Sequence, residues 1–345
     1  MSKIALIANG ITKDDPEALE TILRSNHQDV DIFDVRTMEP TATGWAIREG
    51  DILKPIDPSG YGLVARIIQG GKAGDSEKSW QLQQLFENHG AKPYISVKAA
   101  RGITDKILCR DVLNKNEVPT FSARTFAKDG EEDFATMAAK LEAFAPPYVV
   151  RKSLGSGKDS RVVVATVPEA IAAAEAFRHP PEPNGIASGV VIHPLPARLN
   201  QEIADRYQLG EIGELDKRSY QFRVTSVDGN IFGANLVYSQ PNGFGLNAAQ
   251  GAQFHSVPLE MMPPEVLVLA RKAAKAHQLN IAAVDIAFDN QSDPQVLDMN
   301  ASPDLNFANE QGKLLKSALA DSLRAKAMEG PFSSASSVRT TPIAR

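Results

Sequence analysis

Two neighbouring apolar runs near the carboxyl end of the chain constrain its fold more than any other feature. The sequence IAAVDIAFDNQSDPQVLDMN, residues 281–300, holds two predicted strands, at 281–288 and 295–300, on either side of a polar turn. Asp285 lies in the first strand, and Asp298 and Asn300 share one face of the second because side chains alternate along a strand. Two carboxylates and an amide oxygen on one sheet face suit a hard cation such as Mg²⁺. The alternative is a pair of ordinary strand-end acids, since short motifs often match by chance.

The first part of the chain alternates predicted strands with predicted helices. Helical spacing of apolar side chains predicts helices at 16–28 and 76–90. Strands that alternate with helices predict a parallel α/β sheet for roughly the first 95 residues. The predicted strands of this sheet are the apolar runs at 3–8, 30–35 and 61–68.

The rest of the chain is richer in hairpins. Residues 104–116 are a predicted helix with a Thr or Asp cap. The segment PYVVRKSLGSGKDSRVVVA, residues 147–165, has two β-branched runs around a Gly/Ser/Lys loop, which predicts a hairpin with a flexible tip. Two more strands flank Asp228-Gly229, a dipeptide that favours tight hairpins. Residues 196–218 are charged and poorly periodic, so we interpret them as an insertion.

The composition excludes several classes of protein. With 345 residues, 43% of them apolar and 23% charged, the chain has the make-up of a globular protein that buries a core. Its net charge of −5 argues against a nucleic-acid partner. Cys109 is the only cysteine, so no intramolecular disulfide can form. Because there is neither a run of roughly 20 apolar residues nor a signal-peptide pattern, we expect a cytoplasmic protein without a membrane partner.

The acidic segment resembles the carboxyl end of ATP-grasp enzymes. In that family a Val-Asp strand is followed by an acid, any residue, an Asn and a small residue before Pro. The resemblance extends over most of the chain and is strongest to the RimK-like branch. Its landmarks here are Val284-Asp285, Asp298, Asn300 and Ser302-Pro303, then Asp105-Lys106 at a helix start, PYVVRKSLGSGKDSRV, Gln221 with Arg223, and Asn247 with Gln250-Gly251-Ala252.

The resemblance implies an α/β (α+β ATP-grasp) fold that binds ATP and two Mg²⁺ ions, with Mn²⁺ as the alternative metal. The expected parts are an N-terminal parallel α/β pre-ATP-grasp domain at 1–103, a small central lid at 104–195, a C-terminal ATP-grasp domain at 196–330 and a loose tail at 331–345. Phosphoryl transfer redistributes negative charge, so this chemistry requires cations at fixed positions.

The same resemblance assigns roles to individual residues. Asp285, Asp298 and Asn300 are expected to hold the metal, and Arg223, Asn247 and Gly251 to stabilise the acyl phosphate and the tetrahedral intermediate. The expected nucleotide-binding residues are Lys106, Arg151 or Lys152 for the phosphates, Gly155, Ser156 and Gly157 in the loop over them, and the backbone of Val191, Ile192 and His193 as the adenine hinge. We further expect Arg66, on the strand 61–68, either to face the substrate or to be an edge-strand charge.

The chain departs from the family pattern in several places. The loop has Lys158-Asp159-Ser160-Arg161 where a later glycine is usual, and Asp298 stands where glutamate is customary. Gln221 replaces the Asp that precedes the arginine. An arginine near the end of the following strand is replaced around Val237-Tyr238-Ser239, and the hinge lacks its acid.

We therefore expect an ADP-forming carboxylate–amine ligase that works through an acyl phosphate on small-molecule or peptide carboxylate and amine substrates. The resemblance also suggests a homodimer. Two alternatives stay open: an ATP-binding regulatory module without ligase activity, motivated by the altered loop and the missing arginine, and an ATP-grasp kinase that stops after phosphorylation. Neither the acid nor the amine can be read from the sequence.

Overall fold

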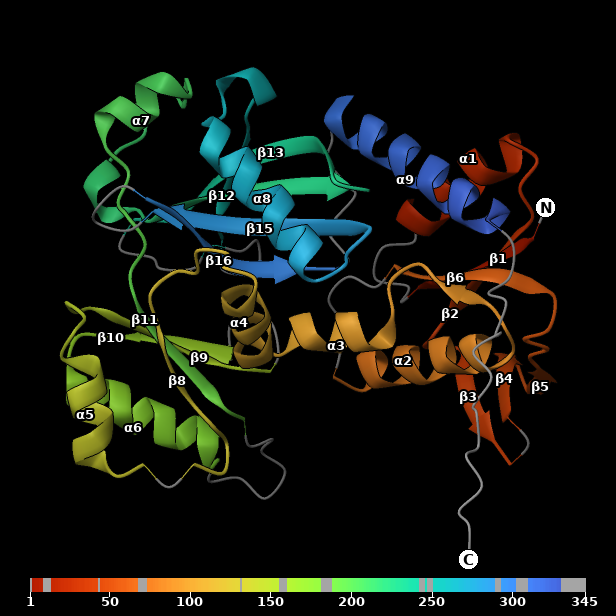
Figure 1. Cartoon of the computed structure of the whole chain (residues 1–345), viewed down its shortest axis with the longest axis horizontal. Coiled ribbons are helices and arrows are strands. Elements are labelled where there is room, and N and C mark those ends of the chain that lie inside the picture. The colour runs from red at the N-terminus through yellow and green to blue at the C-terminus, as the bar shows by residue number, and fades with distance from the viewer. Residues whose placement is uncertain are drawn as a thin grey trace, which may run out of the picture. The chain divides into compact units, whose positions relative to one another are not determined.

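The computed structural model describes residues 2–8, 14–42, 44–67, 73–130, 132–154, 160–180, 188–241, 246, 251–288, 293–301 and 310–329 (Figure 1). The chain forms two compact units. Unit one comprises Met1–Tyr94 and Ala320–Arg345, and unit two comprises Ile95–Leu319.

Unit one is built on a parallel sheet. Its strand order is β2-β1-β6-β7, and all neighbouring strands run parallel, which confirms the predicted α/β arrangement. Apolar side chains such as Ile7, Phe33 and Phe86 form its core. The elements are β1 (Lys3–Ala8), α1 (Asp14–Ser25), β2 (Val30–Asp34), β6 (Tyr61–Ile67), α2 (Ala73–Asn88) and β7 (Lys92–Pro93).

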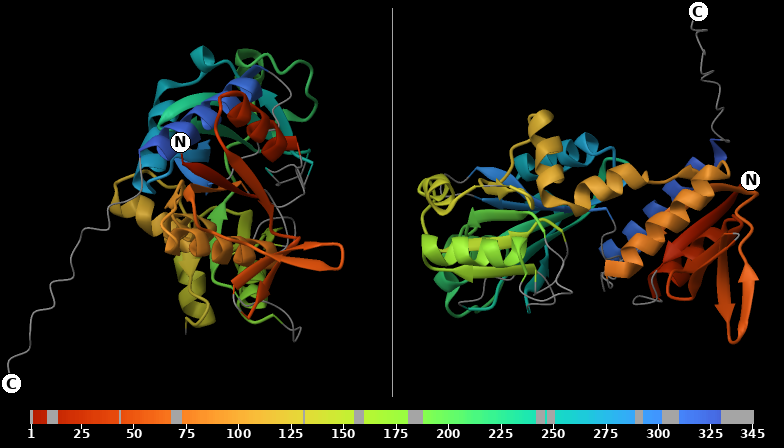
Figure 2. Two further views of the ribbon diagram at one scale, coloured as in Figure 1. Left: turned by 90° about the vertical axis from the view of Figure 1, so that its right-hand side faces the viewer. Right: turned by 90° about the horizontal axis from the view of Figure 1, so that it is seen from below.

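Unit one also holds an antiparallel sheet that the sequence patterns did not predict. It consists of β3 (Met38–Thr41), β4 (Gly44–Glu49) and β5 (Ile52–Pro55), and the hairpin of β4 and β5 projects from the parallel sheet (Figure 2). Gly50 has a φ of +61° in the tight turn between them. All of β5 is exposed, so these short strands lack the apolar alternation by which strands are recognised.

Unit two contains a small sheet, which we define as strands β8 to β11. Its order is β10-β9-β11-β8, and its strands pair antiparallel. The helices α5 and α6 pack on one of its faces over a shared apolar core (Figure 1). The predicted hairpin at 147–165 is β9 and β10. The elements are β8 (Arg124–Phe126), α5 (Phe134–Leu141), β9 (Tyr148–Lys152), β10 (Arg161–Val164), α6 (Val167–Arg178) and β11 (Val190–Pro194).

The large sheet of unit two has the order β14-β13-β12-β15-β16 and is antiparallel. The predicted hairpin at Asp228-Gly229 is confirmed: both residues have positive φ, +47° and +78°, as a tight two-residue turn requires. Helix α8 packs against the sheet. The elements are β12 (Tyr220–Val227), β13 (Asn230–Tyr238), β14 (Gln253–Ser256), α8 (Pro264–Ala276), β15 (Ile281–Phe288) and β16 (Pro294–Asn300).

The remaining elements connect these sheets. The charged segment interpreted as an insertion contains a short helix, α7, which is anchored by the buried Tyr207 against Phe222. Helix α9 was not among the predicted elements. Within the described residues, no helix combines the length and apolarity needed to cross a bilayer. These elements are α3 (Val97–Thr104), α4 (Lys106–Lys115), α7 (Gln201–Arg206), two single turns at Leu215–Lys217 and Leu259–Met261, and α9 (Glu310–Met328).

Candidate functional site

A row of polar side chains crosses the large sheet, one from each strand. Each residue is directly opposite the next one on the neighbouring strand. From β16 to β14 the order is Asp298, Asp285, Arg223, Asn235 and Ser256. Directly opposite residues share a face, so the row lies on one side of the sheet. The alternate positions on β12 and β15 are apolar and buried, as expected for a sheet with one face packed on a helix.

Arg223 and Asp285 form a two-point ion pair within this row. Arg223 Nε donates to Asp285 Oδ1 at 2.7 Å, and Nη2 donates to Oδ2 at 2.8 Å. Both side chains are mostly buried, with 24% and 12% of their surface exposed. Two parallel hydrogen bonds from a planar guanidinium fix the carboxylate in position as well as neutralising it.

Asp298 is held by a cation from the other sheet. Arg151, on β9, donates from Nη2 to Asp298 Oδ2 at 2.5 Å. Burial opposes ionisation of Asp298, but Arg151 and then Lys106 outweigh that effect and lower its pKa to about 2. The small and large sheets therefore meet at a charged centre.

Lys106 reaches this centre from the first turn of α4. The Asp105 carboxylate caps the helix by accepting from the backbone N–H groups of Ile107 and Leu108. The backbone N–H of Lys106 donates to the Ser153 carbonyl at 3.0 Å, which ties the helix start to the end of β9. Burial lowers the pKa of Lys106, and Asp298 partly offsets this.

A pocket lies where these elements meet, and it contains several of the residues expected to bind nucleotide. Lys106, Arg151 and Asp298 stand beside Val191 and His193 of β11. Burial lowers the pKa of His193 to about 3, and Arg151 adds to this shift. The remaining lining residues are Cys109, Arg110, Leu113, Val296 and Leu297.

The side chains of Ile192 and Lys152 point away from the pocket, and for Ile192 this leaves the expected role of its backbone untested. Ile192 is fully buried in the core under α5 and α6, because it alternates with Val191 and His193 along β11. Lys152 alternates with Arg151 on β9, and its ammonium lies 5.2 Å from the ring centroid of Phe177 on α6. The side chain of Arg151, and not that of Lys152, faces the pocket.

Other expected residues lie near the sheet or outside the described residues. Asn300 is exposed on β16, two residues beyond Asp298. Gly251 has a φ of +77°, which only glycine adopts readily, and its carbonyl accepts from Gln240 Nε2 at 2.7 Å. In unit one, the Arg66 guanidinium lies 5.5 Å from the Trp80 ring centroid. Gly155, Ser156, Gly157 and Asn247 lie outside the described residues.

The sequence departures on β12 and β13, at Gln221 and around Val237-Tyr238-Ser239, lie on neighbouring strands of the large sheet. Gln221 is directly opposite Val237, on the same face as Arg223. The acid and the arginine that the family pattern has in this region are therefore both absent from this part of the sheet.

Three polar residues at this centre were not among the expected site residues. Arg110 and Cys109 line the pocket one turn after Lys106. Arg161, the first residue of β10, is directly opposite Arg151. In the sequence, Cys109 and Arg110 are marked only by their helical spacing from Lys106. Arg161 is marked only by its position in the strand that follows the Gly/Ser loop.

This set of donors and acceptors fits magnesium with a polyphosphate. No group of three or more His, Cys, Asp or Glu within the described residues is placed to hold a metal alone. Magnesium bound to phosphates needs only one or two carboxylates from the protein, and Asp285 and Asp298 are directly opposite each other. Lys106, Arg151 and Arg161 would neutralise phosphates beside them.

Comparisons with known proteins agree with this geometry. Residues 211–323 match the model of the RimK-like ATP-grasp domain. No curated protein sequence matches the chain. Among solved structures, the ATP-grasp ligase PsnB complexed with a minimal precursor is 15% identical, with a TM-score of 0.62 over 94% of this chain and 100% of that chain.

Two further structures show the same likeness. D-cycloserine synthetase DcsG is 17% identical, with a TM-score of 0.63 over 93% of this chain and 99% of that chain. D-alanine–D-alanine ligase from Bacillus anthracis is 14% identical, with a TM-score of 0.59 over 96% of this chain and 100% of that chain. The chain therefore has the fold of these ATP-grasp structures, and its residues 211–323 match the RimK-like ATP-grasp domain model.

Proposed function

We propose that the chain is an ATP-dependent carboxylate–amine ligase that forms an amide or peptide bond through an acyl phosphate. The observation that carries this proposal is the meeting of the acids Asp285 and Asp298 with the cations Lys106 and Arg151. Ligases of the same fold, among them PsnB and DcsG, support it. In this proposal residues 1–103, 104–195 and 196–330 act as the N-terminal domain, the lid and the ATP-grasp domain.

The protein's own contribution is charge at fixed positions. Lys106 and Arg151 would bind the phosphates, and Asp285, Asp298 and Asn300 would hold the metal. Magnesium, when bound, supplies positive charge at the phosphate that is transferred. Arg223 and Arg151 neutralise the two acids, and the same two guanidinium groups would bind the anionic substrate in the proposed reaction.

The proposed reaction has two steps. A substrate carboxylate oxygen forms a bond to the γ-phosphorus of ATP while the bond to the ADP oxygen breaks. The amine nitrogen then forms a bond to the acyl carbon, phosphate leaves, and the nitrogen loses a proton. Arg223, close to the metal-binding acids, is placed to stabilise the negative oxygen of the second step.

The test is ATP turnover with magnesium in pools of amino acids and short peptides, with products identified by mass. A ligase releases ADP and phosphate only when an acid and an amine are both present. Asp298→Ala is expected to abolish this turnover, while the matched control Asp205→Ala, on the exposed face of α7, keeps it.

Other outcomes identify the alternatives. A stable phosphorylated product formed without an amine would identify a kinase. Nucleotide binding without turnover in any pool would favour a regulatory module, which the altered loop and the missing arginine around Val237-Tyr238-Ser239 also motivate.

A further inference from the structure

Arg151, which lines the pocket, lies directly opposite a second arginine, Arg161. Arg161 on β10 is the cross-strand partner of Arg151 on β9, so both side chains project from the face that carries Val191. Like charges directly opposite on an antiparallel pair are destabilising. The stability of the fold therefore gives no reason for a second arginine here.

The described residues do not compensate this second charge. Asp298 makes its close contact with Arg151. Arg161 Nε is buried, and it has no hydrogen-bond partner within the described part of the chain. A buried donor of this kind calls for a further acceptor, such as an ion or a ligand.

The charged groups around Arg161 indicate where that acceptor would lie. Burial and Arg151 lower the pKa of Arg161 to about 10, while Asp298 and Asp285 act in the opposite direction. Arg161 is thus close enough to both acids to respond to their charge. Among the described residues, Arg223 pairs with Asp285 and Arg151 pairs with Asp298, so neither acid is left to pair with Arg161.

We propose that Arg161 binds the terminal phosphate of the nucleotide and replaces, from the small sheet, the arginine that is missing on β13. This inference rests on the proposed function. Asp285 and Asp298 would hold a metal that supplies positive charge at the transferred phosphate, and Arg161 would add a second charge there from the small sheet. A guanidinium there would stabilise charge as the phosphoryl group moves to the carboxylate.

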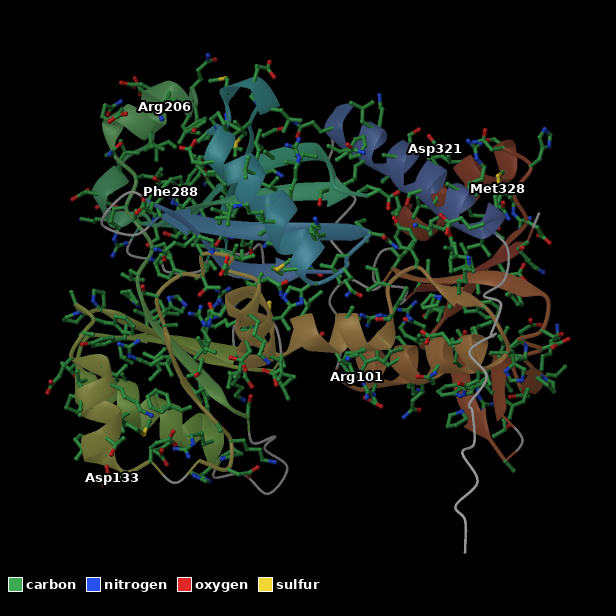
Figure 3. All side chains as sticks on the ribbon, in the orientation of Figure 1. Arg101, Asp133, Arg206, Phe288, Asp321 and Met328 are labelled. Atoms are coloured by element: carbon green, nitrogen blue, oxygen red, sulfur yellow. The ribbon has the colours of Figure 1, made fainter. Side chains whose placement is uncertain are left out.

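The experiment measures dissociation constants by calorimetry for Mg·AMPPNP, Mg·ADP and adenosine. Arg161→Gln is expected to weaken Mg·AMPPNP by about tenfold or more, the value of a charge-assisted hydrogen bond, and to leave adenosine unchanged. Mg·ADP should lose less, and Arg161→Lys should retain part of the affinity. The control is Arg206→Gln on α7, a residue far out on unit two with 52% of its side chain exposed (Figure 3).

The melting temperature without nucleotide separates binding from a structural role. Removing one of two opposed charges is expected to leave the melting temperature of Arg161→Gln unchanged or higher. Equal affinities of wild type and Arg161→Gln for Mg·AMPPNP would overturn the inference, as would an equal loss for adenosine. If the wild type binds none of the three ligands, the proposed function itself fails, and the role of Arg161 fails with it.

Discussion

Arg223 and Asp285 lie opposite each other on β12 and β15, and the guanidinium donates to both carboxylate oxygens. They are 62 positions apart in the sequence, so the pair exists only because β12 and β15 are neighbours in the sheet. The second acid, Asp298, is paired in the same way with Arg151. Each of the two acids thus has its own arginine partner.

Breaking the first pair should be costly. Arg223→Ala leaves the Asp285 carboxylate buried without its partner, and we expect a loss of about 3 kcal/mol in the free energy of unfolding. Urea denaturation measures this loss. Arg206→Ala, which breaks an exposed ion pair with Glu202, should cost less than about 1 kcal/mol. Equal effects of the two substitutions would show that the buried pair does not stabilise the fold.

Asp298 should make stability depend on pH in the acid range. Burial alone would raise its pKa, but Arg151 and Lys106 lower it from 3.8 to about 2 in the folded protein. The folded state therefore gains stability from the ionised carboxylate above about pH 4, and this gain is lost as the pH falls toward 2.

The measurement is the difference in unfolding free energy between wild type and Asp298→Asn at pH 6, 4 and 2.5. We expect the difference to be largest at pH 6 and to shrink in acid. Asp205→Asn, an exposed control on α7, should follow the wild type throughout. A difference that stays constant from pH 6 to pH 2.5 would contradict the assignment.

Arg151 and Lys152 are adjacent on β9, but their side chains point to opposite faces of the small sheet. Arg151→Gln should weaken Mg·ATP binding by about tenfold or more, because the Arg151 side chain lines the pocket. Lys152→Gln is the matched control, since its ammonium lies over Phe177 on the opposite face. We expect it to change the affinity by less than about threefold. A larger loss for the Lys152 variant would reverse the assignment.

Local patterns predicted much of the fold because they depend on near neighbours along the chain. Alternation identified β15 and β16, and the Asp228-Gly229 dipeptide identified the β12–β13 turn, where both residues have positive φ. The acids Asp285 and Asp298 were found in the same way. The short strands β3 to β5, of which β5 is exposed throughout, were not predicted, and α9 was missed.

Contacts between distant segments could not be predicted from these patterns. Arg151 and Asp298 are 147 positions apart, and only the packing of the small sheet against the large one brings them together. Alternation along β11 could show that Ile192 points to the opposite face from Val191 and His193. It could not show which of the two faces of the strand borders the pocket. Arg161 was missed for this reason, because its proposed role depends on Arg151, its partner on the neighbouring strand.

The thiol of Cys109 provides a test that needs no substrate. Burial raises the pKa of Cys109 to about 12, and the charge of Asp298 adds to this. His277 Nε2 lies 3.4 Å from Sγ, but burial lowers the pKa of His277, so a neutral imidazole cannot stabilise the thiolate. Thiolates, not thiols, react with disulfide reagents, so native Cys109 should react very slowly at pH 8.

The rate is followed with a chromogenic aromatic disulfide, and Cys109 is the only cysteine that can react. We expect the native rate to be at least about a hundredfold below the rate in guanidinium, which exposes the thiol. Because Cys109 lines the pocket with Lys106 and Arg151, Mg·ATP should slow the native reaction further, and adenosine without phosphates should slow it less. A native rate close to the denatured rate would show that the thiol is accessible and that the pocket is more open than the structure has it.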